Sequence, residues 1–225
     1  MEGKADNPAA PPAQRLIGQL VADTLRFYGA HFWSSLALGV APAIVVAVAS
    51  QLDRSAAVAV SAGGAVVAAT ASYVAASAMV AGVRPQARTL LVAFAVGVVV
   101  YIPAMLLLGL ILPGLAWLAL FGLSVPAAVS ERLGFVESLR RGLDLGRADF
   151  VHALGTLCTL GLLVFVTGQV MVLAIYGASG HAIQVAAFLA TLVLTPLLFL
   201  GAAHLYGDQA ARAEVKSKRK RSKET

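Results

Sequence analysis

Residues 131–150 read ERLGFVESLRRGLDLGRADF and lie between two long apolar runs of the chain. Apolar residues recur there at steps of three and four, which predicts a short amphipathic helix over residues 135–148. Its charges alternate in sign, and Glu137 stands three or four positions before Arg140 and Arg141, the spacing of ion pairs on a helix surface. The stretch is therefore expected to be a surface helix that joins two apolar segments.

The apolar runs of the chain are long enough to cross a membrane. Charged residues make up 12% of the sequence, against roughly 25% in a typical soluble domain. Four runs contain no acidic or basic residue, and each reaches the roughly 18 to 20 residues that a helix needs to cross hydrocarbon. They are Trp33 to Leu52, Ser55 to Val83, Thr89 to Ser130 and Phe150 to Gly207. The chain is therefore predicted to be an all-α, polytopic transmembrane helical bundle.

Turn residues divide the two longest runs. Pro113 and Gly114 are expected to split the third run, because proline cannot continue a helix and glycine tolerates a tight reversal. The cluster GASGH at 177–181 is expected to split the fourth run. An alternative has four crossings, with the third and fourth segments re-entrant. It places the later residues on the same sides of the membrane as six crossings do. The division predicts about six spans, at 33–51, 56–82, 89–112, 114–130, 150–176 and 182–206.

The basic residues predict how these spans are oriented. With the N-terminus inside, every lysine and arginine except Arg54 lies on the cytoplasmic side, as the positive-inside rule requires. An odd number of spans would move the later basic residues to the other side. We therefore expect a multi-pass protein of the cell's inner membrane with both termini in the cytoplasm.

The two ends of the chain differ from the spans between them. Residues 1–14 are rich in proline and alanine and are expected to form a disordered cytoplasmic tail. Residues 15–31 have apolar residues at helical spacing, which predicts an amphipathic helix on the inner membrane surface. This helix begins a transmembrane helical domain over 15–207, and residues 208–225 follow as a basic cytoplasmic tail.

Two groups of basic residues are candidate contacts for lipid headgroups, because a basic residue beside a membrane is attracted to anionic lipid. Nucleic-acid binding is the competing interpretation of the tail. Neither aromatic residues nor a folded motif accompanies the tail charges, so no specific nucleic-acid partner is expected. The predicted lipid contacts are Arg132, Arg140, Arg141 and Arg147 of the surface helix region, and Lys218, Arg219, Lys220 and Arg221 of the tail.

Within the predicted spans the sequence offers little chemistry. No Asp, Glu, Lys or Arg falls inside any of them, although proton relays and ion sites need such groups. His31, His152 and His204 lie at a similar depth but share no metal-binding motif, so no metal site, cofactor or catalytic residue is expected. Gln169, the most polar residue well inside the fifth span, is predicted to make an interhelical polar contact.

The second span, 56–82, is rich in alanine and valine and lacks leucine and isoleucine. Small residues let neighbouring helices approach closely. This span is therefore predicted to be the most enclosed of the six.

The layout resembles a family of uncharacterised bacterial membrane proteins related to the membrane domain of glycerophosphoryl diester phosphodiesterases. The likeness lies in VPAAVSERLGFVESLRRGLDLGRADFVHALG, residues 125–155, where a span leads into Glu131, Arg132 and Gly134 and then into a short helix. The entry into the first span, LRFYGAHFWSSLAL at 25–38, is also similar. The resemblance implies an integral membrane domain. No extramembrane stretch of this sequence is long enough to hold the family's catalytic domain with its metal-binding residues.

From these observations we expect a non-enzymatic multi-pass membrane protein, envelope- or lipid-related. It is expected to act through helix packing and through contacts with membrane lipids or a membrane-protein partner, without a cofactor. A permease-like transporter of a lipid or other apolar small molecule is the alternative, because kinked helices and small-residue interfaces could work without buried charge.

Overall fold

The computed structural model of the chain describes residues 15–107, 110–175 and 179–224. Within these ranges the chain is helical and no strand is present. Six segments there are long and apolar enough to cross a membrane, which confirms the predicted all-α, multi-pass architecture. They are Phe32–Ala49, Arg54–Ala81, Ala87–Leu106, Ile111–Ser130, Phe150–Ala174 and Gly180–Ser217.

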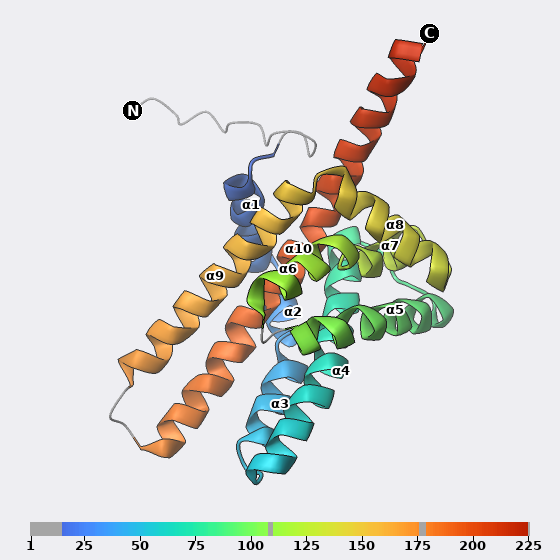
Figure 1. Cartoon of the computed structure of the whole chain (residues 1–225). Coiled ribbons are helices and arrows are strands. Elements are labelled where there is room, and N and C mark those ends of the chain that lie inside the picture. Colours follow the sequence, from blue (N-terminus) through green and yellow to red (C-terminus); the bar gives the residue numbers. More distant parts are fainter. Residues whose placement is uncertain (1–14, 108–109, 176–178, 225) are drawn as a thin grey trace, which may run out of the picture.

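Figure 1 shows how the helices are arranged. Helix α1, helix α8 and the last turns of α10 gather at one end of the bundle, which we call the terminal end. The α3–α4 connection, the end of α9 and the start of α10 lie at the opposite end, while α5 and α6 run across this view. In chain order the helices are α1 (Ile17–Ala30), α2 (Phe32–Ala37), α3 (Val40–Ala49), α4 (Arg54–Ala81), α5 (Ala87–Leu106), α6 (Ile111–Phe121), α7 (Ser124–Ser130), α8 (Phe135–Ala148), α9 (Phe150–Ala174) and α10 (Gly180–Glu224).

The first span is bent into two helices, α2 and α3, at Leu38 and Gly39. A Cβ atom at Gly39 would collide with the backbone carbonyl oxygen of Leu192 on α10. Glycine lets the two backbones approach this closely because it has no side chain to separate them. The bend therefore lies where the first span packs directly against the last.

The third and fourth spans are divided before Pro113, and the predicted division at Pro113 and Gly114 is wrong. Helix α5 ends at Leu106 and α6 begins at Ile111, so both residues lie near the start of α6. Proline is tolerated there, because the first backbone N–H groups of a helix have no intrahelical acceptor. The fourth span bends once more between α6 and α7.

Helix α8 confirms the predicted amphipathic helix, but its charges pair differently. Arg141 Nε lies 2.9 Å from a carboxylate oxygen of Glu131, which precedes the helix. The predicted pairs of Glu137 with Arg140 and Arg141 are not formed among the described side chains. The Glu137 carboxylate instead accepts a hydrogen bond of 3.0 Å from the backbone N–H of Gly134. This cap satisfies a donor at the helix N-terminus, which an exposed ion pair would leave without an acceptor.

Two glycines one helical turn apart hold α8 against the bend between α6 and α7. A Cβ atom at Gly142 would collide with Ser124, and one at Gly146 would lie 2.6 Å from the backbone carbonyl oxygen of Ala119. Both glycines are buried, as is Leu145 between them. Helix α8 therefore does more than cover the bundle, because one of its faces packs backbone against backbone.

Helix α10 passes without a break through the predicted boundary between residues 207 and 208. Asp208 and Gln209 are fully buried, so the boundary is wrong for the first turns of the predicted tail. The last turns of α10 do project beyond the bundle (Figure 1). The predicted disordered tail, 1–14, lies outside the described residues.

The fourth span, not the second, is the most enclosed. Half of the apolar window of Ile111–Ser130 is buried, against 33% of that of Arg54–Ala81. Every residue from Ser124 to Val129 is buried, because α7 packs against α4, α5 and α8. Small residues in α4 permit close approach to one neighbour, but enclosure requires neighbours on all sides.

Candidate functional site

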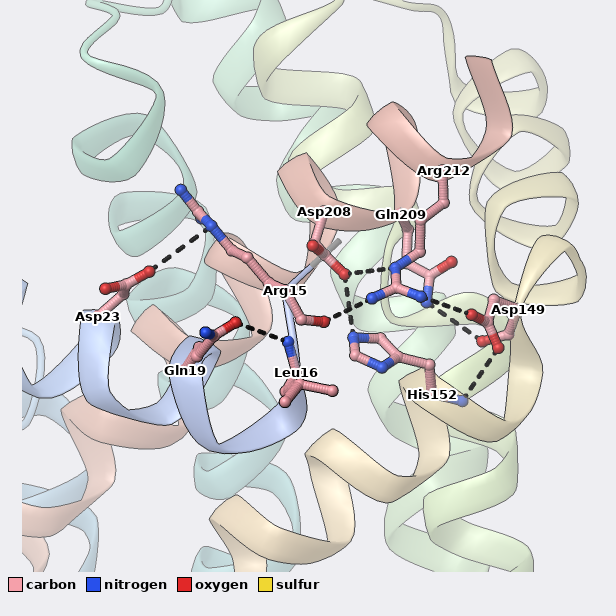
Figure 2. A network of polar contacts seen from close by, with 9 residues as sticks. All are labelled: Arg15, Leu16, Gln19, Asp23, Asp149, His152, Asp208, Gln209 and Arg212. Carbon is pink, nitrogen blue, oxygen red and sulfur yellow. Dashed lines mark hydrogen bonds and ion pairs between the residues drawn. The ribbon is translucent and has the colours of Figure 1, made fainter. Parts of the chain in front are cut away.

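Polar side chains converge around Arg212 at the terminal end of the bundle (Figure 2). Its Nε donates to Oδ2 of Asp208 at 2.8 Å, and its Nη1 donates to Oδ2 of Asp149 at 2.9 Å. Its Nη2 donates to the backbone carbonyl oxygen of Arg15 at 2.6 Å. One side chain of α10 therefore binds the start of α9 and the segment that precedes α1.

Asp208 is the most deeply buried charge of this network. Its side chain is fully buried, and Nε2 of His152 lies 2.9 Å from the carboxylate oxygen that also binds Arg212. A buried carboxylate is strongly destabilising unless it is paired. The contacts with His152 and Arg212 therefore allow Asp208 to be buried. Asp149 caps α9 by accepting from the backbone N–H of His152, and Gln209 donates to the backbone carbonyl of Asp149 at 3.1 Å.

The geometry of this network supports packing more than ion binding. Oδ1 of Asp208 and Oε1 of Gln209 are buried without a hydrogen-bond partner in the part of the chain that the structure describes. The two oxygens point away from each other in Figure 2, so they do not frame a common site. Across the same ranges, no group of three His, Cys, Asp or Glu side chains is arranged to hold a metal ion. We therefore assign the network a structural role, in which it fastens α1, α9 and α10 together.

The three histidines singled out in the sequence do not converge. The rings of His31 and His204 both contact the ring of Phe27, with centroid distances of 4.5 and 5.0 Å. In each histidine Nδ1 lies within hydrogen-bond distance of the backbone carbonyl oxygen four residues earlier in the chain. His152 faces Asp208 instead. His31 and His204 therefore share Phe27 as a neighbour, but His152 has a different partner, and the three described side chains do not form a metal-binding group.

Arg141, one of the predicted lipid contacts, is bound into the bundle. Its Nε donates to Glu131 at 2.9 Å, and the hydroxyl of Tyr206 on α10 donates to the same carboxylate oxygen. Burial is the largest single influence and opposes the charged form of Arg141, but the hydrogen bond to Glu131, the charge of Glu131 and the contact with Tyr206 together outweigh it and raise the pKa of the guanidinium group. This cluster links α8 to α10 in parallel with the Arg212 network.

The other predicted lipid contacts lie on the surface or outside the described side chains. Arg140 and Arg147 are exposed on α8, and neither pairs with a described acidic residue. Arg132 is also exposed and lines a groove of about 640 Å³ together with Arg88. Lys218, Arg219, Lys220 and Arg221 belong to the last turns of α10, and the structure describes their backbone alone.

The interhelical contact predicted for Gln169 is not formed with any residue that the structure describes. Its side chain is exposed on α9 and binds no described residue. Only 6% of the apolar window of α9 is buried, so this helix contacts its neighbours along a narrow face that excludes Gln169. The polar links between helices come from other residues, since Ser72 donates to the carbonyl of Leu38 at 2.7 Å and Trp117 donates to that of Val100 at 2.9 Å.

A cavity of about 450 Å³ lies between the spans. Its size falls within the roughly 300 to 1,000 Å³ of typical ligand pockets. It is therefore the strongest candidate for a binding site at membrane depth. All six spans contribute to its wall, through α3, α4, α5, α6, α9 and α10, for example with Pro42, Ala65, Tyr101, Leu118, Leu157 and Thr195.

The cavity wall contains no charged residue and few polar ones. The hydroxyl of Thr191 donates to the carbonyl of Ala187 on its own helix at 2.8 Å. The hydroxyl of Tyr73 is buried without a hydrogen-bond partner among the described residues, so the wall offers isolated hydroxyls but no group to pair with a charge. A charged ligand would lose its hydration here without gaining a counterion. An apolar molecule fits this wall better.

Sequence reasoning missed both the Arg212 network and the cavity. Asp208 and Arg212 stand four residues apart in the sequence, which is the spacing of a helical ion pair, but their position after an apolar run suggested an exposed tail. No local pattern reveals that Asp149 and His152 approach the same point. The cavity has no local signal either, because six helices form it.

Comparisons of this sequence with protein-family models, with curated proteins and with solved structures find no match. The function is therefore proposed from the geometry, the charges and the sequence pattern of the chain.

Proposed function

We propose that this chain is a non-enzymatic multi-pass membrane protein, envelope- or lipid-related, that binds the hydrocarbon part of a membrane lipid between its helices. The observation that carries this proposal is the apolar cavity of about 450 Å³ to which all six spans contribute. The resemblance in residues 125–155 to a membrane domain of phosphodiester-cleaving proteins supports a lipid-related role. The polar groups at the terminal end bind one another, which supports a structural function for them.

A cavity of this size favours an occupant. An empty apolar space costs packing energy, because the side chains that line it have no partner atoms on one side. Ordered water needs several polar partners at one place, whereas this predominantly apolar wall offers a few hydroxyls, among them that of Tyr73. Hydrocarbon from the surrounding membrane is therefore the material best suited to fill the space.

We further propose that the terminal end faces the cytoplasm of a bacterial cell, with the protein in the inner membrane. Arg15, Arg141 and Arg212 belong to the contacts at this end, whereas Arg54 begins α4 at the opposite end. Basic residues accumulate on the cytoplasmic side of bacterial membrane proteins, which supports this orientation.

Filling the cavity tests the proposed lipid binding. Ala69 lines the cavity from α4, whereas Ala71 is exposed on the same helix and serves as a matched control. The full chain is purified in detergent without added lipid, and the lipid retained per mole of protein is measured by mass spectrometry. Ala69→Phe is expected to retain roughly tenfold less lipid than Ala71→Phe or the wild type, which corresponds to about 1.4 kcal/mol. Equal retention by all three folded proteins would contradict the proposal.

A permease-like transporter is the second candidate, because the helices that line the cavity contain prolines. Pro103 lies inside α5 and Pro196 inside α10, and each removes a backbone hydrogen bond and can permit bending. Proteoliposomes loaded with a fluorescent lipid distinguish the two functions. Saturable flux that Ala69→Phe abolishes and Ala71→Phe preserves would favour a transporter, whereas lipid retention without flux would favour a binding protein.

A further inference from the structure

A groove of about 640 Å³ lies on the surface where the α4–α5 connection meets the α7–α8 connection. Arg88 and Arg132 line it together with apolar residues that include Val92 and Phe135. The starts of α5 and α8 lie at the same edge of the molecule in Figure 1. The groove shares no lining residue with the apolar cavity, so it is a separate site.

The two arginines of the groove differ from those of the neighbouring networks. Arg141 and Arg212 bind carboxylates of the chain, whereas neither Arg88 nor Arg132 is paired with a described acidic residue. Glu137 also lines the groove, and a backbone N–H engages its carboxylate. The groove therefore presents two guanidinium groups that form no ion pair within the described part of the chain, beside one carboxylate, so its lining keeps a positive balance.

Arg132 is also held in an uncommon backbone conformation. Its φ of 55° lies in the left-handed region, which residues other than glycine seldom adopt. Such conformations persist where the surrounding structure imposes them, and they concentrate at ligand sites. The conformation therefore places a strained arginine, rather than a glycine, at the edge of the groove.

We infer that this groove binds the phosphate group of an anionic membrane lipid between Arg88 and Arg132. Guanidinium groups bind phosphate through paired, charge-assisted hydrogen bonds. Apolar surface adjoins the charges, since Leu91 is 72% exposed one turn along α5 and Val136 is 73% exposed at the start of α8. A lipid uses both features, because its acyl chains can cover the apolar surface while its phosphate meets the arginines. A soluble phosphate would leave the apolar surface in water.

This inference rests on the proposed function, because it requires that the protein lies in a lipid membrane. It adds that the bound lipid has an anionic headgroup. The detergent-purified full chain is titrated with phosphatidylglycerol, with phosphatidylcholine of the same acyl chains, and with inorganic phosphate, and bound ligand is counted by native mass spectrometry. The wild type is expected to prefer phosphatidylglycerol, and Arg88→Gln with Arg132→Gln is expected to lower that affinity by roughly tenfold or more. The preference is expected to weaken at high salt.

Two control variants separate a specific site from general surface charge. Arg26→Gln with Arg54→Gln removes the same charge from exposed positions outside the groove and is expected to bind like the wild type. Arg132→Gly suits the left-handed backbone, so it is expected to remain folded while its affinity falls. Ala69→Phe is expected to bind normally at the groove, so a failure of the cavity proposal is distinguishable from a failure here. Equal losses in the two double variants, or equal binding of inorganic phosphate, would overturn the inference.

Discussion

At the scale of single residues, Arg212 donates three hydrogen bonds at the terminal end. It binds the carboxylate of Asp208, the carboxylate of Asp149, which caps α9, and the backbone carbonyl oxygen of Arg15. A lysine has a single nitrogen and could not reach all three acceptors in the same plane. The guanidinium geometry is therefore what joins three segments that lie far apart in the sequence.

Replacement of Arg212 by glutamine is expected to lower the free energy of unfolding by about 3 to 5 kcal/mol, because it leaves Asp208 buried without its main counterion. Chemical unfolding in mixed micelles measures the change. Arg147→Gln, at an exposed arginine, serves as the control and is expected to change stability by less than about 0.5 kcal/mol.

The double variant Asp208→Asn with Arg212→Gln distinguishes the buried charge from lost packing. It is expected to be more stable than Arg212→Gln alone, because it no longer buries an unpaired carboxylate. A double variant that is less stable than either single variant would show that the electrostatic explanation is wrong.

At the scale of secondary-structure elements, α8 is positioned by its glycines more than by its charges. Gly142 and Gly146 allow its backbone to touch the bend between α6 and α7, whereas Arg140 and Arg147 stay on the exposed side. Ion pairs on a helix surface contribute only about 0.2 to 0.5 kcal/mol each. Close packing of the glycine face is therefore the main reason that this helix lies where it does.

Gly146→Ala is expected to destabilise the protein by about 1 to 3 kcal/mol, because the new methyl group meets two backbone carbonyl oxygens that cannot move aside easily. Those oxygens belong to Ala119 and Leu120, at 2.6 and 2.7 Å from the position of the added Cβ atom. Thermal unfolding in detergent, followed by circular dichroism, measures the effect.

The control for this change is Gly63→Ala in α4, where nothing lies within 4 Å of an added Cβ atom. Alanine at this helical position is expected to be neutral or stabilising by up to about 1 kcal/mol. If both variants lost stability equally, the close packing of α8 would not explain its position.

At the scale of the whole molecule, six segments are long enough to span a membrane, and the last turns of α10 lie at the same end of the bundle as α1 (Figure 1). The Arg212 network closes this arrangement, because it ties α1 at the beginning of the described chain to α10 at its end. The cavity lies between spans that the network holds only at one end. At the opposite end, where α3, α4, α9 and α10 meet their connections, no ion pair between described residues joins the helices.

Cysteine labelling in intact cells tests the proposed orientation of the whole molecule. Gln51 lies in the α3–α4 connection and Arg147 on α8, and both are exposed. In a background with Cys158→Ala, a membrane-impermeant thiol reagent is expected to label Gln51→Cys directly and Arg147→Cys only after the cells are permeabilised. The reverse pattern would place the terminal end outside the cell, against the charge bias that supports the orientation.

The predictions for α8, Pro113 and Gln169 had different outcomes in the structure. Residues 135–148 were predicted as a helix because apolar periodicity depends on neighbours within one turn, and α8 has these bounds. The break predicted at Pro113 is wrong because α6 starts just before this residue, where proline is tolerated. The polarity of Gln169 predicts a partner, but this side chain lies on an exposed face of α9.

The sequence by itself determined that this chain is an all-α bundle with six segments able to span a membrane, because hydropathy and helical period are local properties. The tertiary structure decided which faces meet: it buried Asp208 beside His152 and Arg212, pressed Gly146 against α6, and left a cavity of about 450 Å³ between the spans. These features depend on distances between residues far apart in the chain. Local patterns carry no information about such distances, so the candidate sites became visible only when the helices were packed together.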